Sequence, residues 1–302
     1  MKLPKPISMA TAACSAYQAR ISSIAASITP RVLVSTSGSG NYGESGKANF
    51  YTIDELPVAL TRDDLPSLTV AEEEEEELRR VDIDLGPDRQ AFIIDNVLTP
   101  EESDALASCA EAILNANGHS RVAPAIRTPP GMRINEAAHW YPPHGSSLLP
   151  TIYRRIENLV PKTVNGGGLP LHSKLSEKVA QFKYNQGDQF NRHVDGLFPG
   201  QGANPKGDGV DEWTGVVSGF SLLFYLNDAE DGLEGGETRL WSRDGSIYKD
   251  ITPRKGRVLA FRRGSHDAVL HAGLEVTGHV PKYMALINLA YGEQTGTRPL
   301  MQ

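Results

Sequence analysis

Three residues, His193, Asp195 and His271, have the side chains and the order that a metal site requires. Two imidazoles and one carboxylate in an H-x-D…H arrangement can hold one face of a ferrous ion and leave the opposite face open. The same side chains also suit catalytic zinc with an open position. H-x-D alone is a weak signal because it arises by chance in many proteins. The surrounding sequence therefore decides what the three residues can do.

That surrounding sequence is more specific than the three residues themselves. It contains Tyr184-Asn-Gln-Gly187-Asp-Gln-Phe190-Asn-Arg-His193-Val-Asp195-Gly196, then Phe224-Tyr225-Leu226-Asn227, Gly235-Gly236-Glu237-Thr238, Pro253-Arg-Lys-Gly256-Arg-Val-Leu-Ala-Phe261, and finally His271-Ala-Gly273…Val276…Lys282-Tyr283. In this order and spacing it resembles the catalytic domain of prolyl 4-hydroxylase-type 2-oxoglutarate- and Fe(II)-dependent dioxygenases. The resemblance covers residues 91–292 and is strongest over residues 177–292.

The resemblance implies a double-stranded β-helix of jelly-roll type with iron at one open end. His193 and Asp195 match the family's H-x-D, and His271, followed by x-Gly, matches its distal histidine. Lys282 matches the basic residue that pairs with the far carboxylate of 2-oxoglutarate, and Tyr184 matches a tyrosine that also holds it. The implied cofactors are Fe(II), 2-oxoglutarate and O2, with ascorbate as a reductant.

Elementary chemistry supports the same roles. A facial set of three ligands leaves two positions for a chelating 2-oxo acid and one for O2. The far carboxylate needs a buried cation, because an unpaired charge taken out of water costs several kcal/mol. A lysine supplies three donors and a tyrosine hydroxyl one more. A lone lysine is usually exposed, however, and an aromatic residue in a strand is more often core packing.

Other residues compete for these roles. His266 lies five residues before His271, and His279 lies in Gly278-His-Val-Pro281, which is typical of a turn. We favour His271 because of its x-Gly context and its distance from Lys282. If Lys282 is not the anchor, Arg262 or Arg263 is the alternative. The Gly235-Gly236-Glu237-Thr238 motif is interpreted as a turn that enters a strand, with glycines at positive φ.

The chain also departs from the family. The interval from His271 to Lys282 is one residue longer than usual, with Pro281 directly before the lysine. Leu286 and Asn288 stand where many relatives have an arginine and an aspartate, so we expect a different substrate pocket. The Gly-rich segment from Phe198 to Val217 is inserted between two strands and is predicted to be a mobile lid.

The local patterns predict an α+β fold with a mainly β core, a jelly roll with N-terminal supporting helices. Thr99, Pro100 and Glu102 form a capping-box pattern for a helix to about Asn117, and a second helix is predicted over Leu148–Leu159. Strands are predicted at residues 91–94, 182–184, 220–226, 258–261 and 283–291. The strand at residues 283–291 has apolar residues at both odd and even positions, as expected for a strand covered on both faces.

Four segments follow from these patterns. Residues 1–47 are predicted to be a disordered or targeting leader, because the first 43 residues lack Asp and Glu and are rich in Ser, Ala and Thr. Residues 48–90 form an N-terminal extension whose acidic run, Glu72 to Glu77, is interpreted as a solvated helix face or linker. Residues 91–292 form the dioxygenase domain, and residues 293–302 form a C-terminal tail.

Bulk properties exclude several classes. A net charge of −7 argues against a general nucleic-acid binder, and no apolar run approaches the roughly 20 residues of a membrane helix. Two cysteines, Cys14 and Cys109, make a disulfide framework unlikely. We therefore expect an intracellular protein, cytoplasmic or organellar, outside the secretory pathway.

The leading hypothesis is an oxygenase that hydroxylates a C–H bond of a peptide or a small molecule and releases succinate and CO2. Prolyl peptides are the substrates that the family name suggests. The alternatives are a non-catalytic metal-binding jelly roll and a zinc hydrolase. Zinc would require neither Lys282 nor Tyr184 beside it.

Overall fold

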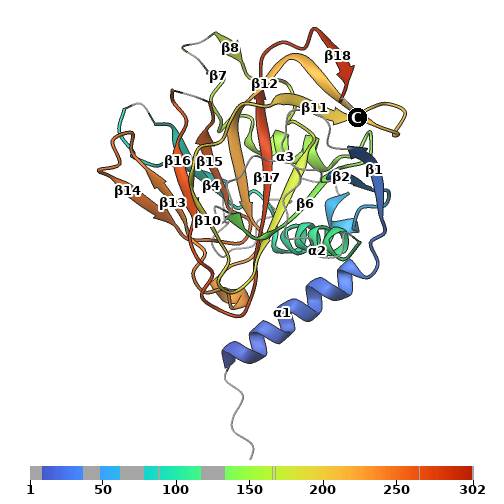
Figure 1. Ribbon diagram of the computed structural model, residues 1–302, viewed down its shortest axis with the longest axis vertical. Coiled ribbons are helices and arrows are strands. Elements are labelled where there is room, and N and C mark those ends of the chain that lie inside the picture. Colours follow the sequence, from blue (N-terminus) through green and yellow to red (C-terminus); the bar gives the residue numbers. More distant parts are fainter. Residues whose placement is uncertain are drawn as a thin grey trace, which may run out of the picture.

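Two β-sheets face each other in the computed structural model and form the jelly roll that the sequence predicts (Figure 1). The structure describes residues 9–36, 48–61, 78–87, 89–116, 133–164, 166, 168–264 and 266–300. The larger sheet has the order β1 (Pro30–Thr36), β2 (Ala48–Ile53), β6 (Glu136–Tyr141), β9 (Val179–Tyr184), β17 (Lys282–Tyr291), β12 (Val210–Tyr225), β15 (Val258–Arg262), β4 (Ala91–Asp95) and β3 (Arg79–Asp82). Two more strands, β11 (Pro199–Ala203) and β18 (Gly296–Pro299), pair with β12.

The smaller sheet has the order β14 (Tyr248–Ile251), β13 (Thr238–Trp241), β16 (Leu270–Gly273), β10 (Gln189–His193) and β5 (Arg133–Ile134). A separate pair is formed by β7 (Thr163–Val164) and β8 (Leu169–Pro170).

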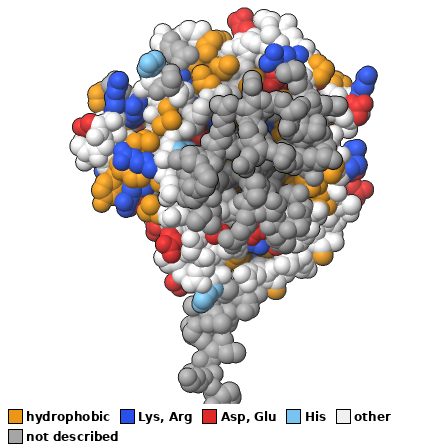
Figure 2. Space-filling model, viewed as in Figure 1, with side chains coloured by type: hydrophobic (Ala, Val, Ile, Leu, Met, Phe, Trp, Pro, Cys, Tyr) orange, Lys and Arg blue, Asp and Glu red, His pale blue; other side chains and the backbone are white. Residues whose placement is uncertain are grey.

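Figure 2 shows basic and hydrophobic side chains together on the side of the molecule formed by β13 and β14, where Arg192 lies 4.6 Å from the Trp241 ring and Arg239 lies 4.3 Å from the Tyr248 ring. Aromatic faces attract cations at such distances, so this edge of the smaller sheet carries two cation–π pairs.

Helices cover the outer face of the larger sheet (Figure 1). They are α2 (Pro100–Ala116) and α3 (Leu148–Ile156), with the short 3-10 helix η1 (Val58–Leu60). A second 3-10 helix, η2 (Ala229–Asp231), has no buried residue. The predicted capping box is present, since the Thr99 amide donates to Glu102 Oε2 at 2.9 Å and the Glu102 amide donates to Thr99 Oγ1 at 3.2 Å. Helix α3 ends three residues earlier than predicted, and Arg155 ties it to Glu102 of α2 at 2.7 Å.

Two cores lie on the two faces of the larger sheet. On β12, Leu222 and Phe224 pack toward the helices, whereas Leu223 and Tyr225 belong to the core between the sheets. The side chains of a strand alternate between its faces, so a strand covered on both sides must be apolar at both parities. The prediction of such a strand at residues 283–291 is confirmed by β17, whose residues are almost all buried.

Residues 9–36 of the expected leader are part of the fold. Residues 9–25 form helix α1 (Met9–Ala25), followed by β1, so the interpretation of a disordered tail is wrong for residues 9–36. Tyr17 and Ile21 are 2% and 1% exposed and join the core under the helices. The interpretation as a targeting segment stays a prediction. The physical reason for the error is that α1 is stabilised by packing on α2 rather than by a strong pattern of its own.

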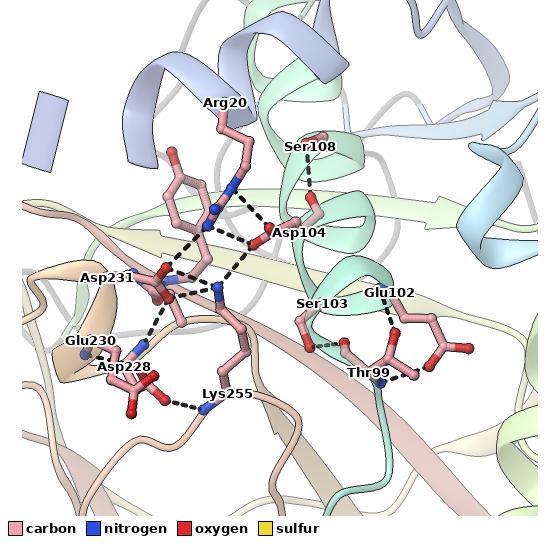
Figure 3. A network of polar contacts seen from close by, with 12 residues as sticks. Arg20, Thr99, Glu102, Ser103, Asp104, Ser108, Asp228, Glu230, Asp231 and Lys255 are labelled. Atoms are coloured by element: carbon pink, nitrogen blue, oxygen red, sulfur yellow. Dashed lines mark hydrogen bonds and ion pairs between the residues drawn. The ribbon is translucent and has the colours of Figure 1, made fainter. Parts of the chain in front are cut away.

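Ion pairs fix α1 to the rest of the protein (Figure 3). We call Arg20, Asp104, Asp231 and Lys255 the α1 cluster. The Arg20 guanidinium lies 2.8 Å from Asp104 and 3.1 Å from Asp231, and the Lys255 ammonium lies 3.0 Å and 2.8 Å from the same two carboxylates. Two cations thus meet two anions, and α1, α2 and η2 are held at one point.

The segment predicted to be a mobile lid is a β-hairpin. Strand β11 pairs with Val210–Val217 of β12, and β18 pairs with the other edge of the same stretch. Gly200 is required by packing, because a Cβ there would lie 2.6 Å from Trp213 Cε3. Gly200 therefore makes room for a tryptophan side chain.

The predicted segment boundaries at residues 91 and 292 do not coincide with the edges of the larger sheet. Strands β1, β2 and β3 come from the expected leader and extension, and β18 comes from the expected tail. The acidic run Glu72 to Glu77 and the predicted helix end at Asn117 lie outside the described residues. Cys109 is a buried free cysteine, and in the described part of the chain no helix is long and apolar enough to cross a membrane.

Candidate metal and cosubstrate site

His193, Asp195 and His271 come together on the smaller sheet. His193 ends β10 and lies opposite His271 of the neighbouring β16, and Asp195 follows two residues later. The Nε2 atoms of His193 and His271 lie 3.7 Å and 3.9 Å from Asp195 Oδ1. One ligand atom from each residue lies within 4.8 Å of the others. Such a group can hold a metal ion.

The two competing histidines lie elsewhere. His266 and His279 are exposed, and neither belongs to the group formed by His193, Asp195 and His271. The backbone carbonyl of His266 accepts a hydrogen bond from Arg89. The geometry therefore agrees with the choice of His271.

Backbone carbonyls orient both imidazoles. His193 Nδ1 lies 2.7 Å from the Asn191 carbonyl and His271 Nδ1 lies 3.0 Å from the Val269 carbonyl. A carbonyl can only accept, so each Nδ1 carries the proton and each Nε2 keeps its lone pair. Hydrogen bonds of this kind fix the tautomer of metal-binding histidines. Burial lowers the pKa of His271, against the opposing charge of Asp195, and this favours the neutral, ligating form.

Asp195 is held through its other carboxylate oxygen. Ser221 donates a short hydrogen bond to Oδ2, and Arg263 Nη1 lies 3.5 Å from the same atom. Burial alone would raise the pKa of Asp195, but the Arg263 charge, the two histidines and the Ser221 hydroxyl together lower it well below its usual value. Asp195 is therefore ionised, with Oδ1 directed at the two imidazoles.

Lys282 lies in the cavity between the sheets and is 1% exposed. Its ammonium donates to the Gly236 carbonyl at 2.5 Å. Burial lowers the pKa of Lys282 to about 7, and Glu237 opposes the shift. Gly236, at φ 76°, makes room for this side chain, because a Cβ there would lie 3.0 Å from Lys282 Cδ. The predicted positive φ of the Gly235-Gly236 turn is confirmed.

Tyr184 lies directly across from Lys282 in the pairing of β9 with β17. The Lys282 ammonium is 5.4 Å from the centre of the Tyr184 ring and 5.4 Å from that of Tyr225. Sequence reasoning missed Tyr225, whose hydroxyl donates to Thr238 at 2.8 Å. The lysine and the predicted tyrosine thus share one end of the cavity.

The cavity has a volume of about 370 Å³, and its floor is formed by two strands. Every second residue lines it, namely Lys178, Ala180, Phe182 and Tyr184 from the β9 segment and Lys282, Met284, Leu286 and Asn288 from β17. The predicted positions of Leu286 and Asn288 inside the barrel are confirmed. His193, Asp195 and His271 line the facing wall.

The two arginines proposed as alternative anchors are engaged elsewhere. Arg262 pairs with Asp267 at 2.7 Å and donates to the Gly219 carbonyl. Arg263 lines the cavity, but its guanidinium donates to Ser221 at 2.8 Å, Asn288 at 2.7 Å and the Gly196 carbonyl. Sequence reasoning missed this supporting role of Arg263 and Ser221, because no local motif links them to Asp195.

The donor set fits Fe(II). It offers two neutral imidazole nitrogens and one carboxylate oxygen from a single wall, which leaves the side toward the cavity open. Lys282 stands in the same cavity without a carboxylate among its hydrogen-bond partners in the described part of the chain. A dicarboxylate could therefore reach from the metal position to this cation.

One comparison with known protein families agrees with this chemistry. Residues 179–290 match the model of the 2OG-Fe(II) oxygenase superfamily. A comparison with curated protein sequences found no significant match. Among solved structures, a viral collagen prolyl hydroxylase from Paramecium Bursaria Chlorella virus-1 is similar at 20% identity and a TM-score of 0.43, over 67% of this chain and 96% of that one.

Two further structures are similar at comparable levels. A Pseudomonas putida prolyl-4-hydroxylase shares 16% identity with a TM-score of 0.42, over 68% of this chain and 92% of that one. A prolyl hydroxylase from Trichoplax adhaerens, in complex with a hypoxia inducible factor peptide fragment, shares 18% identity with a TM-score of 0.42, over 67% and 83%. The family match over residues 179–290 and the site together carry the assignment: the protein is a 2-oxoglutarate-dependent dioxygenase that uses Fe(II) and O2.

Proposed function

We propose that this protein hydroxylates a C–H bond of a peptide or small-molecule substrate while 2-oxoglutarate is converted to succinate and CO2. In this proposal His193, Asp195 and His271 hold Fe(II), and Lys282 with Tyr184 holds the far carboxylate of 2-oxoglutarate. The single observation that carries it is the shared cavity: three convergent ligand atoms line one wall, and a buried lysine stands at one end.

The chain's own residues prepare the site for this chemistry. When bound, Fe(II) supplies the redox chemistry that activates O2. Asn191 and Val269 hold the imidazoles in the ligating tautomer through their carbonyls, and Ser221 and Arg263 keep Asp195 ionised. The side chains of Phe182, Met284 and Leu286 make the middle of the cavity apolar.

The test is anaerobic reconstitution with Fe(II), followed by 2-oxoglutarate, ascorbate and air, with succinate as the readout. We expect slow succinate release without substrate, and faster release with an accepted one. His193→Ala should lose bound iron and release succinate only at the rate of a protein-free control. Equal succinate release by the wild type and His193→Ala would refute the proposal.

Two arms address the alternatives. Zinc-loaded protein without 2-oxoglutarate should have no hydrolytic activity toward ester or peptide substrates, and activity with zinc alone would favour the zinc hydrolase. A panel of peptides, with prolyl peptides first, and small molecules should be screened for stimulation of succinate release. Each hit requires a mass increase of one oxygen atom in the substrate, which separates hydroxylation from uncoupled turnover.

A further inference from the structure

We propose that the end of the cavity at Lys178 is a second anion subsite, which binds a carboxylate group of the substrate. It is separate from the Lys282 end, which the proposed function assigns to 2-oxoglutarate. The inference deepens that function and rests on it for the reaction, but the binding it predicts can be measured without turnover.

The geometry places the two lysines at opposite ends of the same floor. Lys178 lies six residues before Tyr184, which is roughly 20 Å along an extended strand, and Tyr184 is the residue opposite Lys282. Between them the floor is apolar, since Ala180 pairs with Leu286 and Phe182 pairs with Met284. A chain of carbon atoms fits such a floor, and an anionic group fits each end.

Lys178 has no ion pair or hydrogen bond to any described residue. Its ammonium lies 5.0 Å from the centre of the Phe50 ring, which comes from β2. Partial burial and the charge of Arg263 lower the pKa of Lys178 to about 8, so it remains largely protonated at neutral pH. A cation placed against an aromatic ring and a cavity, without a carboxylate, is available to an anion from outside.

The cavity around Lys178 offers a hydrogen-bond donor and few acidic side chains that would repel a bound anion. Gln201 lines the cavity, and its backbone carbonyl accepts a hydrogen bond at 2.7 Å from the amide of Glu177, the residue before Lys178. Its Oε1 accepts a hydrogen bond from the Tyr141 hydroxyl, so its side-chain amide nitrogen remains a donor. Asp195 is the one acidic residue among the described residues that line the cavity, against the three cations Lys178, Arg263 and Lys282. This excess of positive charge disfavours a cationic substrate group and favours an anionic one.

A carboxylate is the anion that best fits this end. Lys178 supplies one charge, and the Arg263 donors are occupied by Ser221, Asn288 and Gly196. A phosphate dianion would remain under-compensated there, because taking excess charge out of water is costly. A single carboxylate needs one cation and one or two donors, which Lys178 and Gln201 can supply.

The test uses hexanoate and hexanamide, which share an apolar chain and differ in charge. Their dissociation constants are measured by calorimetry on the full-length protein, anaerobically, with Fe(II) and saturating 2-oxoglutarate so that the Lys282 end is filled. We expect hexanoate to bind at least tenfold more tightly than hexanamide. Lys178→Met should remove this difference, whereas Lys174→Met, an exposed lysine four residues earlier, should preserve it.

Each possible result of these measurements either supports or overturns the carboxylate subsite at Lys178. Equal binding of the two probes, binding of neither, or a preference retained in Lys178→Met would overturn the subsite. Hexyl phosphate bound more tightly than hexanoate would overturn the carboxylate assignment. Succinate release by the wild type is followed in parallel: selective hexanoate binding without succinate refutes the proposed function alone, and succinate release with equal binding refutes the subsite alone.

Discussion

Buried positive charge is treated differently in the α1 cluster and in the cavity. In the α1 cluster, Lys255 meets the carboxylates of Asp104 and Asp231 at 3.0 Å and 2.8 Å, and Arg20 contacts the same pair. In the cavity, Lys282 has the Gly236 carbonyl and two aromatic rings for neighbours. Lys255 is thus paired with carboxylates of the fold, whereas Lys282 has no carboxylate among its hydrogen-bond partners in the described residues.

The difference separates a structural charge from a functional one. An ammonium taken out of water without a counter-ion costs free energy, so a fold retains it only where something else repays the cost. Burial lowers the pKa of Lys282 to about 7, which is the sign of such a cost. A buried, unneutralised lysine in a cavity is therefore a candidate for binding an anion.

The largest expected effect is on cosubstrate binding. Lys282→Met should weaken 2-oxoglutarate binding by about 100-fold, because a charge-assisted contact to a carboxylate is worth about 2–3 kcal/mol. Iron content should stay unchanged, since His193, Asp195 and His271 remain. Titration of 2-oxoglutarate into Fe(II)-loaded protein measures the dissociation constant, and metal analysis provides the control. An unchanged dissociation constant would place the anchor elsewhere.

The next expected effect is on the free energy of unfolding, which should respond differently to substitutions in the α1 cluster and in the cavity. Lys255→Met leaves Asp104 and Asp231 with Arg20 alone, and should lower the free energy of unfolding by about 2 kcal/mol. Lys282→Met should leave the unliganded protein as stable as the wild type or more so, because no carboxylate loses an ion pair or a hydrogen bond. Urea denaturation measures both, with Lys249→Met, an exposed lysine, as the control. A larger loss of stability in Lys282→Met than in Lys255→Met would contradict the comparison.

The sequence predicted the cavity better than the α1 cluster, for a physical reason. His193, Asp195, His271 and Lys282 lie in local motifs, and the β17 floor follows from the period-2 alternation of a strand. The contacts of Arg20 bridge 84 and 211 residues, and no local pattern encodes them. Lys178 belongs to no motif. It can be placed on the cavity floor only once β9 is known, because it lies an even number of residues before Tyr184 and therefore on the same face of the strand. Gly200 is typical of a flexible loop in the sequence, but in the fold it makes room for Trp213.

A smaller effect concerns pH. The pKa of Lys282 is lowered from 10.5 to about 7, so the unliganded protein loses this proton as the pH rises through 7. Binding of the cosubstrate dianion requires the charged form. The dissociation constant should therefore be flat below pH 7 and rise up to tenfold per pH unit above it. Lys282→Arg keeps its charge and should remove this slope. Equal slopes in the two proteins would show that another group titrates.

The smallest expected effect tests whether one residue of the α1 cluster contributes most of its stabilisation of the fold. The Arg20 side chain is 48% exposed, whereas those of Lys255, Asp104 and Asp231 are 13%, 11% and 9% exposed. Water screens an exposed ion pair, so Arg20→Ala should lower the free energy of unfolding by only about 0.5 kcal/mol. Lys255 then continues to neutralise both carboxylates, and 2-oxoglutarate binding should not change. Urea denaturation of Arg20→Ala beside Lys255→Met measures the ratio. If Arg20→Ala costs as much as Lys255→Met, the cluster acts as one unit, and α1 contributes as much to the fold as the buried lysine does.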